Sequence, residues 1–435
     1  MTAVQPIAVE ARMYQVGFGD CFLFSFRYAR KLPDGRSDRH LLVDFGSSRA
    51  PAGWAGKVSE RLAAVAESIR TVTAGHLDVL VATHRHKDHV SAFADATVAS
   101  IIKALAPAHI VRPWTDDPAE PADATTPGAL FKRRLAHADA ISTAIARASA
   151  DDARFAPLLP AAELQLANLQ ALTMLDALGT AGSVAFVSAG DDPGIAARIP
   201  GISVDVLGPP TIEQWPSVTQ ARADDASEFW LVPPSLRDDA QASAPGSAPT
   251  VPIDPRRHPD RVQGQARWLI ERLRNRNLGE VEGIVTTVDG ALNNTSVILL
   301  LRVGERTILL PGDAQIESWA YTLLNPANPR RDELAKALGA VDMYKVGHHG
   351  SRNATPKTLV NLWQAAPMRH RTSLMSTLSG VHGSSPITAV PSSRLDAALP
   401  KLFTTFTTDG LDDATPCIAL STKTDTDAPW ALIGP

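Results

Sequence analysis

Hydrophobic and polar residues form both helix-like and strand-like patterns over the first quarter of the chain. Between residues 57 and 70, apolar side chains recur at three- and four-residue steps, which predicts a helix with one apolar stripe. A second helix is predicted over 91–106. Short apolar runs that end in polar turns predict strands at residues 9–16, 21–29, 40–46, 77–84 and 109–114. We therefore expect these helices to pack on a sheet.

Strand signals return strongly in the C-terminal part of the chain. The predicted strands are residues 281–290, 295–303, 306–313, 371–378 and 401–406, with one more that leads into a loop within 341–350. Helices are predicted over 356–364 and 391–399. Two strand-rich halves that each carry helices indicate a mixed α/β (α+β) fold, in which two sheets pack face to face with helices outside.

The middle of the chain has a different character. Ala-rich stretches near 128–150 and 160–178 are helical, and residues 216–262 are rich in Pro, Ala, Ser and Asp. That last stretch has too little apolar surface to offset chain entropy, which predicts an exposed insertion or a disordered excursion. We expect one domain over 1–435, divided into an N-terminal half (1–114), an insertion (115–280) and a C-terminal half (281–435).

Composition excludes several classes of protein. The 42 Lys and Arg residues against 46 Asp and Glu residues give a net charge of -4, so contact with phosphate would need local basic patches or bound metal. Only two cysteines occur, too few for a disulfide scaffold or a Cys-rich zinc module. The sequence shows neither a secretory signal nor a membrane span, and we expect a cytoplasmic protein without a membrane partner.

Four potential metal ligands lie within six residues in the segment HRHKDH. They are His84, His86, Asp88 and His89, and they follow a predicted buried strand. Imidazole and carboxylate suit zinc, manganese or iron, and a turn lets neighbouring side chains converge. The alternative is a solvated polar loop that holds surface histidines.

Two later segments also place metal-type residues where predicted strands end. Asp313 lies in LLPGDAQIE, where its carboxylate could bridge two cations or, alternatively, cap a helix that begins near Ala314. His348 and His349 lie in KVGHHGS. Adjacent side chains diverge, so one histidine is expected to bind metal while the other forms hydrogen bonds or donates a proton; the alternative is a purely structural pair.

These segments resemble the motifs of a known family. HRHKDH, PGDAQIE and KVGHHGS, in this order, are similar to the HxHxDH, (S/T)GDxxxxE and KxGHHGS motifs of metallo-β-lactamase-fold proteins, in particular the hydrolase domain of the competence protein ComEC. VGFGDCFLF, LLVDFGSS and NNTSVILLLR are similar to further segments of that family. The resemblance covers roughly 8–112 and 281–410. It implies a four-layer αββα sandwich with a large central insertion.

The resemblance also implies a centre for two divalent metal ions, Zn²⁺ or Mn²⁺. One ion would bind His84 and His86. The second would bind Asp88 and His89 together with His348 or His349. The carboxylate of Asp313 would bridge both ions.

Other residues are expected around this centre. Asp44 is expected to support the metal-binding loop, and Asp20 to approach the site. Ser351 and Asn353 could contact a substrate phosphate together with the histidine of the His348–His349 pair that binds no metal. Asn294, in the NNTSVILLLR segment, is a candidate for either role.

The sequence departs from the family pattern after the strand at 109–114. Many members supply a further histidine to the first metal there, whereas this loop reads RPWTDDPAE. Asp116 or Asp117 could substitute, His137 could reach in from the insertion, or the site could use a single ion. Phe18 also stands where the family usually has Gln.

The leading hypothesis for function is hydrolysis of a phosphodiester, with DNA or RNA as a possible substrate, by a metal-activated hydroxide. Asp88 and the histidine of the pair 348–349 that binds no metal would act on the reacting groups. One alternative is a small-molecule ester, lactone or β-lactam hydrolase whose specificity lies in the insertion. Another is a non-catalytic subunit with structural metal, in which the insertion docks partner proteins.

Overall fold

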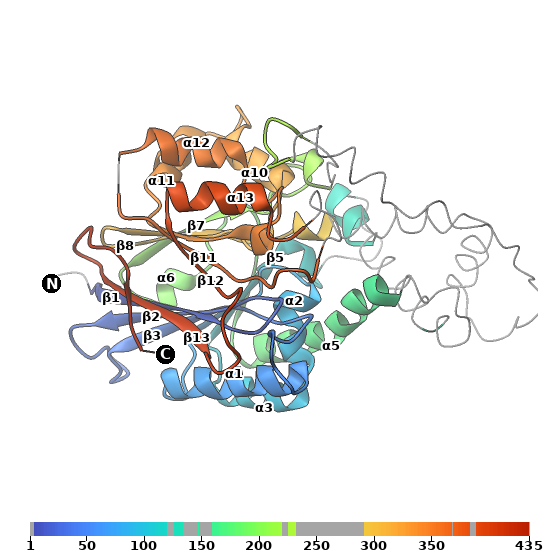
Figure 1. The fold of residues 1–435 in the computed structure, drawn as a ribbon, viewed down its shortest axis with the longest axis vertical. Helices are drawn as coiled ribbons and strands as arrows, with labels where there is room; N and C mark the ends of the chain where they lie inside the picture. Colours follow the sequence, from blue (N-terminus) through green and yellow to red (C-terminus); the bar gives the residue numbers. More distant parts are fainter. Residues whose placement is uncertain are drawn as a thin grey trace, which may run out of the picture.

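Two mixed β-sheets lie face to face, and helices cover the outer face of each sheet (Figure 1). The computed structural model describes residues 4–119, 126–133, 147, 159–219, 225–231, 291–367, 369–382 and 389–434. Within these residues the order of layers is helices, sheet, sheet, helices. The mixed α/β class and the two packed sheets expected from the sequence are confirmed.

The first sheet has eight strands in the order β14-β13-β1-β2-β3-β4-β5-β6. Their bounds are β1 (Pro6–Tyr14), β2 (Cys21–Tyr28), β3 (Asp38–Phe45), β4 (Val79–Val81), β5 (His109–Pro113), β6 (Val184–Val187), β13 (Cys417–Lys423) and β14 (Ala431–Leu432). Pairing is antiparallel from β14 to β3 and parallel from β3 to β6. The parallel part brings the ends of β3 and β4 to the same edge.

The second sheet has six strands in the order β12-β11-β10-β9-β8-β7. Their bounds are β7 (Ile202–Gly208), β8 (Ile298–Val303), β9 (Arg306–Leu310), β10 (Met343–Lys345), β11 (Thr372–Met375) and β12 (Thr404–Thr407). Strands β7, β8 and β9 pair antiparallel, and β9 to β12 pair parallel. The ends of β9 and β10 therefore also lie at one edge.

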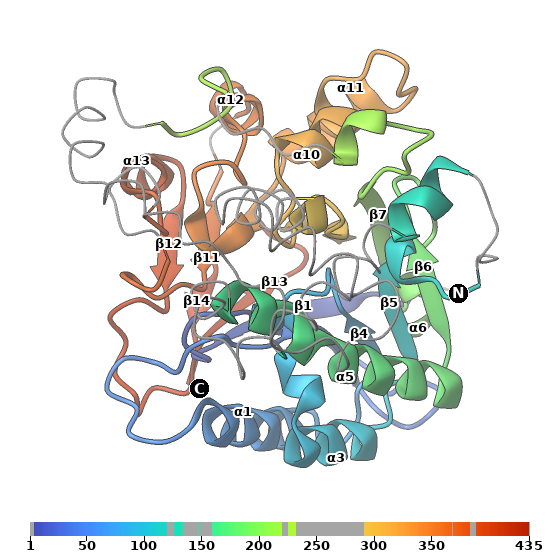
Figure 2. The same cartoon turned by 90° about the vertical axis from the view of Figure 1, so that its right-hand side faces the viewer.

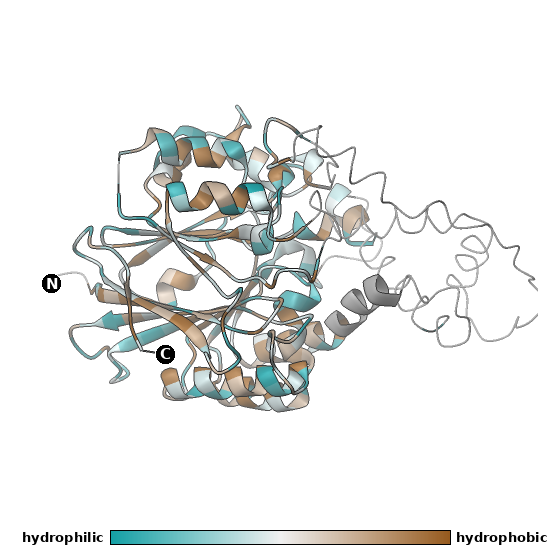
Figure 3. Cartoon of the chain, in the orientation of Figure 1, coloured by the Kyte–Doolittle hydropathy of each residue, from teal (hydrophilic) through white to brown (hydrophobic). Residues whose placement is uncertain are grey.

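Helices α1 (Val58–Val72), α3 (Ala96–Ala104) and α5 (Leu159–Ala181) cover the first sheet. Figure 2 shows α1 and α3 side by side beneath it. Helices α10 (Ile316–Leu323), α11 (Arg331–Gly339), α12 (Lys357–Ala365) and α13 (Ser393–Ala398) cover the second sheet. Figure 3 shows hydrophilic and hydrophobic residues on the same helices, as expected for elements with one buried side. No helix in the described ranges is both long and apolar enough to span a bilayer.

Short helical turns join these elements. They are α2 (Lys87–Val90), α6 (Ile195–Arg198) and the 3-10 turns η1 (Ser91–Ala94), η2 (Trp114–Asp116), η4 (Pro216–Thr219), η5 (Gly347–Gly350) and η6 (Leu399–Lys401). Three of them, α2, η2 and η5, follow directly on the loops that leave β4, β5 and β10. These are the segments in which the sequence places its metal-type residues.

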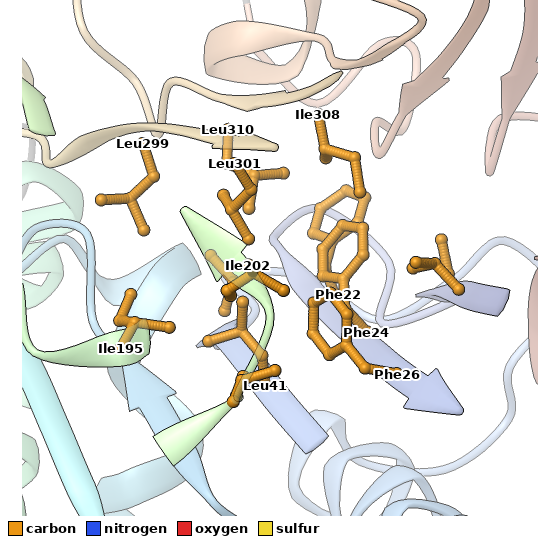
Figure 4. Packing of buried hydrophobic residues seen from close by; sticks show 14 of the residues in the cluster. Phe22, Phe24, Phe26, Leu41, Ile195, Ile202, Leu299, Leu301, Ile308 and Leu310 are labelled. Atoms are coloured by element: carbon orange, nitrogen blue, oxygen red, sulfur yellow. The ribbon is translucent and has the colours of Figure 1, made fainter. Parts of the chain in front are cut away.

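Alternating apolar residues fill the space between the sheets. Phe22, Phe24 and Phe26 point to the same side of β2, because side chains two apart in a strand share a face. They pack with Leu299 and Leu301 from β8 across the interface (Figure 4). The shared interior holds the two sheets, and hence the two halves of the chain, in one fixed arrangement.

The stretch expected as an insertion over 115–280 contributes to both sheets. Strand β6 pairs with β5, and β7 pairs with β8. Sequence analysis predicted neither strand: β6 is a four-residue edge strand with partly exposed side chains, so its hydrophobic pattern is weak. Strands β6 and β7, which lie within this stretch, therefore each extend one of the two sheets. Strands β13 and β14 were also not predicted.

The other predicted segments of the middle of the chain can be compared only where the structure describes them. Helix α5 confirms the helix predicted near 160–178. The predicted strand at 281–290 and most of the stretches 128–150 and 216–262 lie outside the described residues.

Replacing Phe24 by Ala should destabilise the fold by about 3–5 kcal/mol, because it opens a cavity between the sheets. Thermal or urea unfolding measures the change. Ile7→Ala is the matched control, since Ile7 is an apolar residue of the neighbouring strand β1 that is 52% exposed, and its effect should stay within about 0.5 kcal/mol. Equal effects of both substitutions would contradict the packing described here.

Candidate metal centre

The metal-type residues gather where strands of both sheets end. Asp44 is near the end of β3, and the HRHKDH segment follows β4. Asp313 follows β9, and the His348–His349 pair follows β10. Because these ends lie at one edge of the facing sheets, residues more than 200 positions apart in the sequence meet there.

Four buried or half-buried side chains form one compact group of potential metal ligands. They are Asp88, His89, Asp313 and His349, and one ligand atom of each lies within 4.8 Å of those of the others. Nε2 of His89 is 3.0 Å from Oδ2 of Asp313. Nε2 of His349 is 3.0 Å from Oδ2 of Asp88 and 3.9 Å from Oδ2 of Asp313. The sequence prediction thus named all four members of this group.

The chemistry of this group fits a divalent cation. Two imidazole nitrogens and two carboxylate oxygens are donors that zinc and manganese accept. Nε2 of His89 is buried and makes no hydrogen bond, although it faces a carboxylate oxygen. Two carboxylates that share a buried site with this nitrogen need positive charge close by. A cation between these atoms would satisfy all of them.

A hydrogen bond at Nδ1 orients each imidazole of the group. Nδ1 of His89 is 2.8 Å from Oδ2 of Asp44, whose two oxygens also accept hydrogen bonds of 2.7 Å from the backbone and side chain of Thr83. Nδ1 of His349 is 2.9 Å from the carbonyl oxygen of Ser376. In the neutral form with hydrogen on Nδ1, both rings would present the lone pair of Nε2 to the centre. Asp44 therefore contacts the HRHKDH segment through the far nitrogen of the His89 ring.

Charge within the cluster sets the protonation of its members. Burial lowers the pKa of an imidazole, but the carboxylates of Asp313, Asp44 and Asp20 outweigh burial and raise the pKa of His89 well above its usual range. Burial raises the pKa of a carboxyl, but the positive charges of His89, His348 and Lys345 hold the pKa of Asp313 well below its usual range. The carboxylates thus favour the positively charged form of His89, and the neighbouring positive charges favour the ionised form of Asp313.

Lys345 is a buried cation that sequence analysis missed. Its ammonium group forms an ion pair with Asp20, donates to the carbonyl oxygen of Gly312 at 3.1 Å and lies 3.4 Å from Oδ1 of Asp313. Burial opposes its charge, but Asp20 and Asp313 outweigh burial and raise the pKa of Lys345. The sequence offered one signal for a buried lysine: Lys345 lies in the KVGHHGS segment, at the end of a buried strand.

Asp20, Asp44 and His89 form a second group of potential ligand atoms within 4.8 Å. The partners already described occupy this group, since Lys345 pairs with Asp20 while Thr83 and His89 bind Asp44. Asp20 thus approaches the centre as expected, at 3.5 Å from Nδ1 of His349. Its role is charge compensation for a buried lysine.

His84 and His86 lie next to the four-residue group. Nε2 of His84 is 3.1 Å from Nδ1 of His86, and the His84 ring lies 4.1 Å from the His89 ring between centroids. Burial, followed by the neighbouring imidazoles, lowers the pKa of His84 well below its usual range. Within the described part of the chain, neither residue belongs to a set of three or more converging ligands.

The aspartates expected to complete the first metal position have other partners. Asp116 is buried, and its Oδ1 accepts hydrogen bonds of 3.1 and 2.7 Å from Nε and Nη2 of Arg85. Its Oδ2 accepts one of 3.2 Å from Arg112. Oδ1 of Asp117 accepts from the backbone N–H of Ala119 at 2.9 Å. His137 lies outside the described residues.

The pair His348–His349 stands in an unusual backbone conformation. Both residues have positive φ, of 45° and 52°, which costs an L-residue about 1–2 kcal/mol. Such strain concentrates at functional sites. The turn places His349 in the buried group, whereas His348 is 25% exposed and 3.8 Å from Oδ2 of Asp313. Of the two histidines, His349 is therefore the member of the buried group, and His348 is partly exposed beside it.

The remaining candidates support loops. Helix α10 begins at Ile316 with Gln315 as its N-cap, so Asp313 is not the cap that sequence analysis weighed as an alternative. Asn294 is buried; it donates to Glu317 at 3.1 Å and accepts from the backbone N–H of Gln315 at 3.1 Å. It therefore steadies the turn after Asp313. The hydroxyl of Ser351 donates to Oδ1 of Asn353 at 2.7 Å, and both residues follow directly on His349.

Phe18 forms an apolar wall of the centre. Its ring lies 4.4 Å from the His349 ring and 4.5 Å from the His382 ring, between centroids. This contact excludes water from one side of the His349 imidazole. Phe18, which stands where the family usually has Gln, thus packs against two imidazole rings.

A scan against protein-family models gives no match, and a search of curated proteins gives none either. The site is therefore interpreted from its geometry and from the motif resemblance alone.

Gly46→Ala should displace the loop that carries Asp88 and His89. A Cβ at Gly46 would stand 2.6 Å from the carbonyl oxygen of Lys87 and 2.7 Å from the backbone of Asp88, closer than real contacts allow. We expect a lower melting temperature and weaker metal binding, both measured on the purified protein. Gly339→Ala is the control, because a Cβ there meets only ordinary contacts of 3.5 Å. Unchanged metal affinity in Gly46→Ala would contradict the backbone packing described.

Proposed function

We propose that this chain is a metal-dependent hydrolase of the metallo-β-lactamase fold that cleaves phosphodiesters. The observation that carries the proposal is the buried group of Asp88, His89, Asp313 and His349 at the shared edge of the two sheets. The αββα order of layers supports it, as does the position of all three motifs at strand ends. The motif resemblance supplies the fold family and the substrate class.

A bound divalent cation would supply Lewis-acid chemistry: it lowers the pKa of a water molecule and neutralises charge on a phosphoryl oxygen. The chain itself supplies the ligands and their orientation, since Asp44 and Ser376 fix the rings of His89 and His349. His348, which lies partly buried beside Asp313, can hold or deliver a proton. Asn353, just beyond it, accepts from the hydroxyl of Ser351 through Oδ1 and can donate a hydrogen bond from its amide nitrogen to a substrate oxygen.

A covalent nucleophile is not needed for this reaction, and the cysteines are unsuited to that role. Cys21 and Cys417 are both buried thiols. Burial raises the pKa of each, which disfavours the reactive thiolate. Direct attack by water on the substrate is therefore the mechanism that these residues favour.

Asp313→Asn should abolish metal binding and hydrolysis. The substitution keeps the shape of the side chain but removes the charge that faces His89 and His348. Even the loss of an outer partner of a ligand costs about 10–100-fold in affinity or activity, so we expect a loss of more than about 100-fold. Metal content and kcat/KM are the measurements. Asp332→Asn, at an exposed aspartate of α11, is the control and should leave both unchanged; full activity in Asp313→Asn would refute the proposal.

The substrate class is tested with the metal-loaded protein. We expect turnover of bis(p-nitrophenyl) phosphate with Zn²⁺ or Mn²⁺, and cleavage of plasmid, single-stranded DNA or RNA. Turnover confined to esters, lactones or β-lactams would contradict the phosphodiesterase proposal and favour a small-molecule hydrolase. Bound metal without turnover of any of these compounds would instead favour a structural metal in a binding subunit.

A further inference from the structure

We infer that residues 225–231 form a strap that holds the loop after His349 in place, with Trp230 and Glu228 as positioning residues for the candidate metal centre. The inference rests on the proposed function, because it concerns how a ligand of that centre is kept in its geometry. It gives a role to part of the stretch 115–280, for which the motif resemblance offers none. Contacts of the strap with the loop and with the helix that follows it carry the inference.

The strap is a tight turn that packs on the second sheet. The backbone N–H groups of Glu228 and Phe229 donate to the carbonyl oxygen of Asp225 at 3.2 and 2.7 Å. The carboxylate of Asp225 accepts from the N–H and the hydroxyl of Ser227 at 3.0 and 2.6 Å. Phe229 is 1% exposed and belongs to the apolar cluster that includes residues of α10 and α12. Burial of this ring anchors the strap beside the loop.

Trp230 holds the loop between His349 and α12 at two carbonyl groups. Its backbone N–H donates to the carbonyl oxygen of Arg352 at 3.0 Å. Its indole N–H donates to the carbonyl oxygen of Thr355 at 2.7 Å, although the two residues are 125 positions apart in the sequence. Thr355 is fully buried, and a buried carbonyl outside regular secondary structure needs such a donor. The strap thus supplies hydrogen bonds that the loop cannot make within itself.

Glu228 caps the helix in which this loop ends. Helix α12 begins after Pro356, which makes no side-chain cap bond, and its first turn contains no acidic residue. The carbonyl oxygen of Glu228 accepts from the N–H of Lys357 at 3.1 Å, and its carboxylate accepts from the N–H and hydroxyl of Thr358 at 3.0 and 2.5 Å. A carboxylate at this position satisfies free N–H groups and favours the helix dipole. The strap, which lies against α12 in Figure 2, therefore fixes where the loop ends.

A series of hydrogen bonds connects the strap to the turn that carries His349. The hydroxyl groups of Thr355 and Tyr344 are bonded at 2.8 Å, and the Tyr344 hydroxyl accepts from the backbone N–H of Gly347 at 3.3 Å. These three residues are buried. Gly347 directly precedes His348 and His349, whose positive φ values persist only where the surrounding structure supports them. The strap is part of that support.

His349 is the ligand that this support reaches. Its Nε2 lies 3.0 Å from Oδ2 of Asp88 and 3.9 Å from Oδ2 of Asp313. A ligand displaced by about 1 Å binds its metal less well, because metal–ligand distances are narrowly defined. The strap therefore acts on the centre through His349. The centre depends in this way on a segment that lies outside all three motifs.

Hydrogen exchange of the metal-free chain tests the strap without any assay of activity. Trp230→Ala removes the indole that donates to Thr355, and it should speed exchange in peptides that cover 347–356, while peptides from β1 exchange as before. Trp54→Ala is the matched control, because it removes another half-buried indole, which donates to the carbonyl oxygen of Lys57 at 3.1 Å. Unchanged exchange over 347–356 in Trp230→Ala would overturn the inference.

Metal titration and kinetics connect the strap to the centre. At a temperature where the variants are folded, Trp230→Ala should raise the Kd of Zn²⁺ or Mn²⁺ and, at saturating metal, lower kcat for bis(p-nitrophenyl) phosphate, each by about 10–100-fold. KM should change little. Trp230→Phe, which keeps a ring but loses the N–H, should show an effect of about 2–10-fold. Glu228→Ala should change Kd and kcat in the same direction.

The two measurements separate positioning from other roles. A lower melting temperature with unchanged Kd and kcat would leave the strap a purely structural role, and a higher KM with unchanged kcat would indicate direct contact with substrate; either result would overturn the inference. Both would leave the proposed function intact. Absence of metal binding and of turnover in the unmodified chain would instead refute the proposed function and, with it, the positioning of a metal ligand. The exchange rates over 347–356 would then still decide whether the strap holds the loop.

Discussion

Compensation of buried negative charge is the constraint on which this site depends. Asp20, Asp44 and Asp313 are almost fully enclosed between the sheets, and Asp88 lies beside them. An isolated carboxylate in such surroundings would be strongly unfavourable, so each needs hydrogen bonds or positive charge. Lys345 pairs with Asp20, and the backbone and hydroxyl of Thr83 bind Asp44. The remaining pair, Asp88 and Asp313, faces the two imidazoles of His89 and His349, and a cation in this position would complete the compensation.

The same constraint explains why the two halves of the chain must be accurately placed. The contact between Asp88 and His349 joins residues 261 positions apart. The hydroxyl of Ser376, whose carbonyl orients His349, donates to the carbonyl oxygen of Gly19 in the first half. Interdigitated side chains between the sheets hold this geometry, because close-packed interiors permit little displacement. The site is thus a property of the interface between the sheets and of neither half alone.

Local patterns in the sequence were sufficient to predict much of this arrangement. The period of apolar residues predicted α1, whose Leu62, Val65 and Ile69 are buried as one stripe. The concentration of ligands in one short segment predicted where the centre lies. His349 was named among the expected ligands, but the left-handed backbone that turns its side chain into the buried group could not be predicted, because no side-chain pattern encodes it.

Other features depend on contacts between distant residues. The ion pairs of Lys345 with Asp20 and of Arg85 with Asp116 join different loops, and single charged residues in a sequence do not reveal their partners. Strand β6 escaped prediction for a related reason, since an edge strand with partly exposed side chains lacks a clear alternation. Sequence reasoning therefore identified the candidate metal ligands better than it identified the residues that orient these side chains or neutralise their charge.

The position of β13 has a consequence for how the chain is made. This strand lies between β14 and β1, and it pairs Lys423 with Ala8. While the ribosome is still translating the preceding residues, β1 has no neighbour on that side and presents unpaired backbone groups, a state that favours association with other chains. The first sheet can therefore be completed only after β13 has been synthesised.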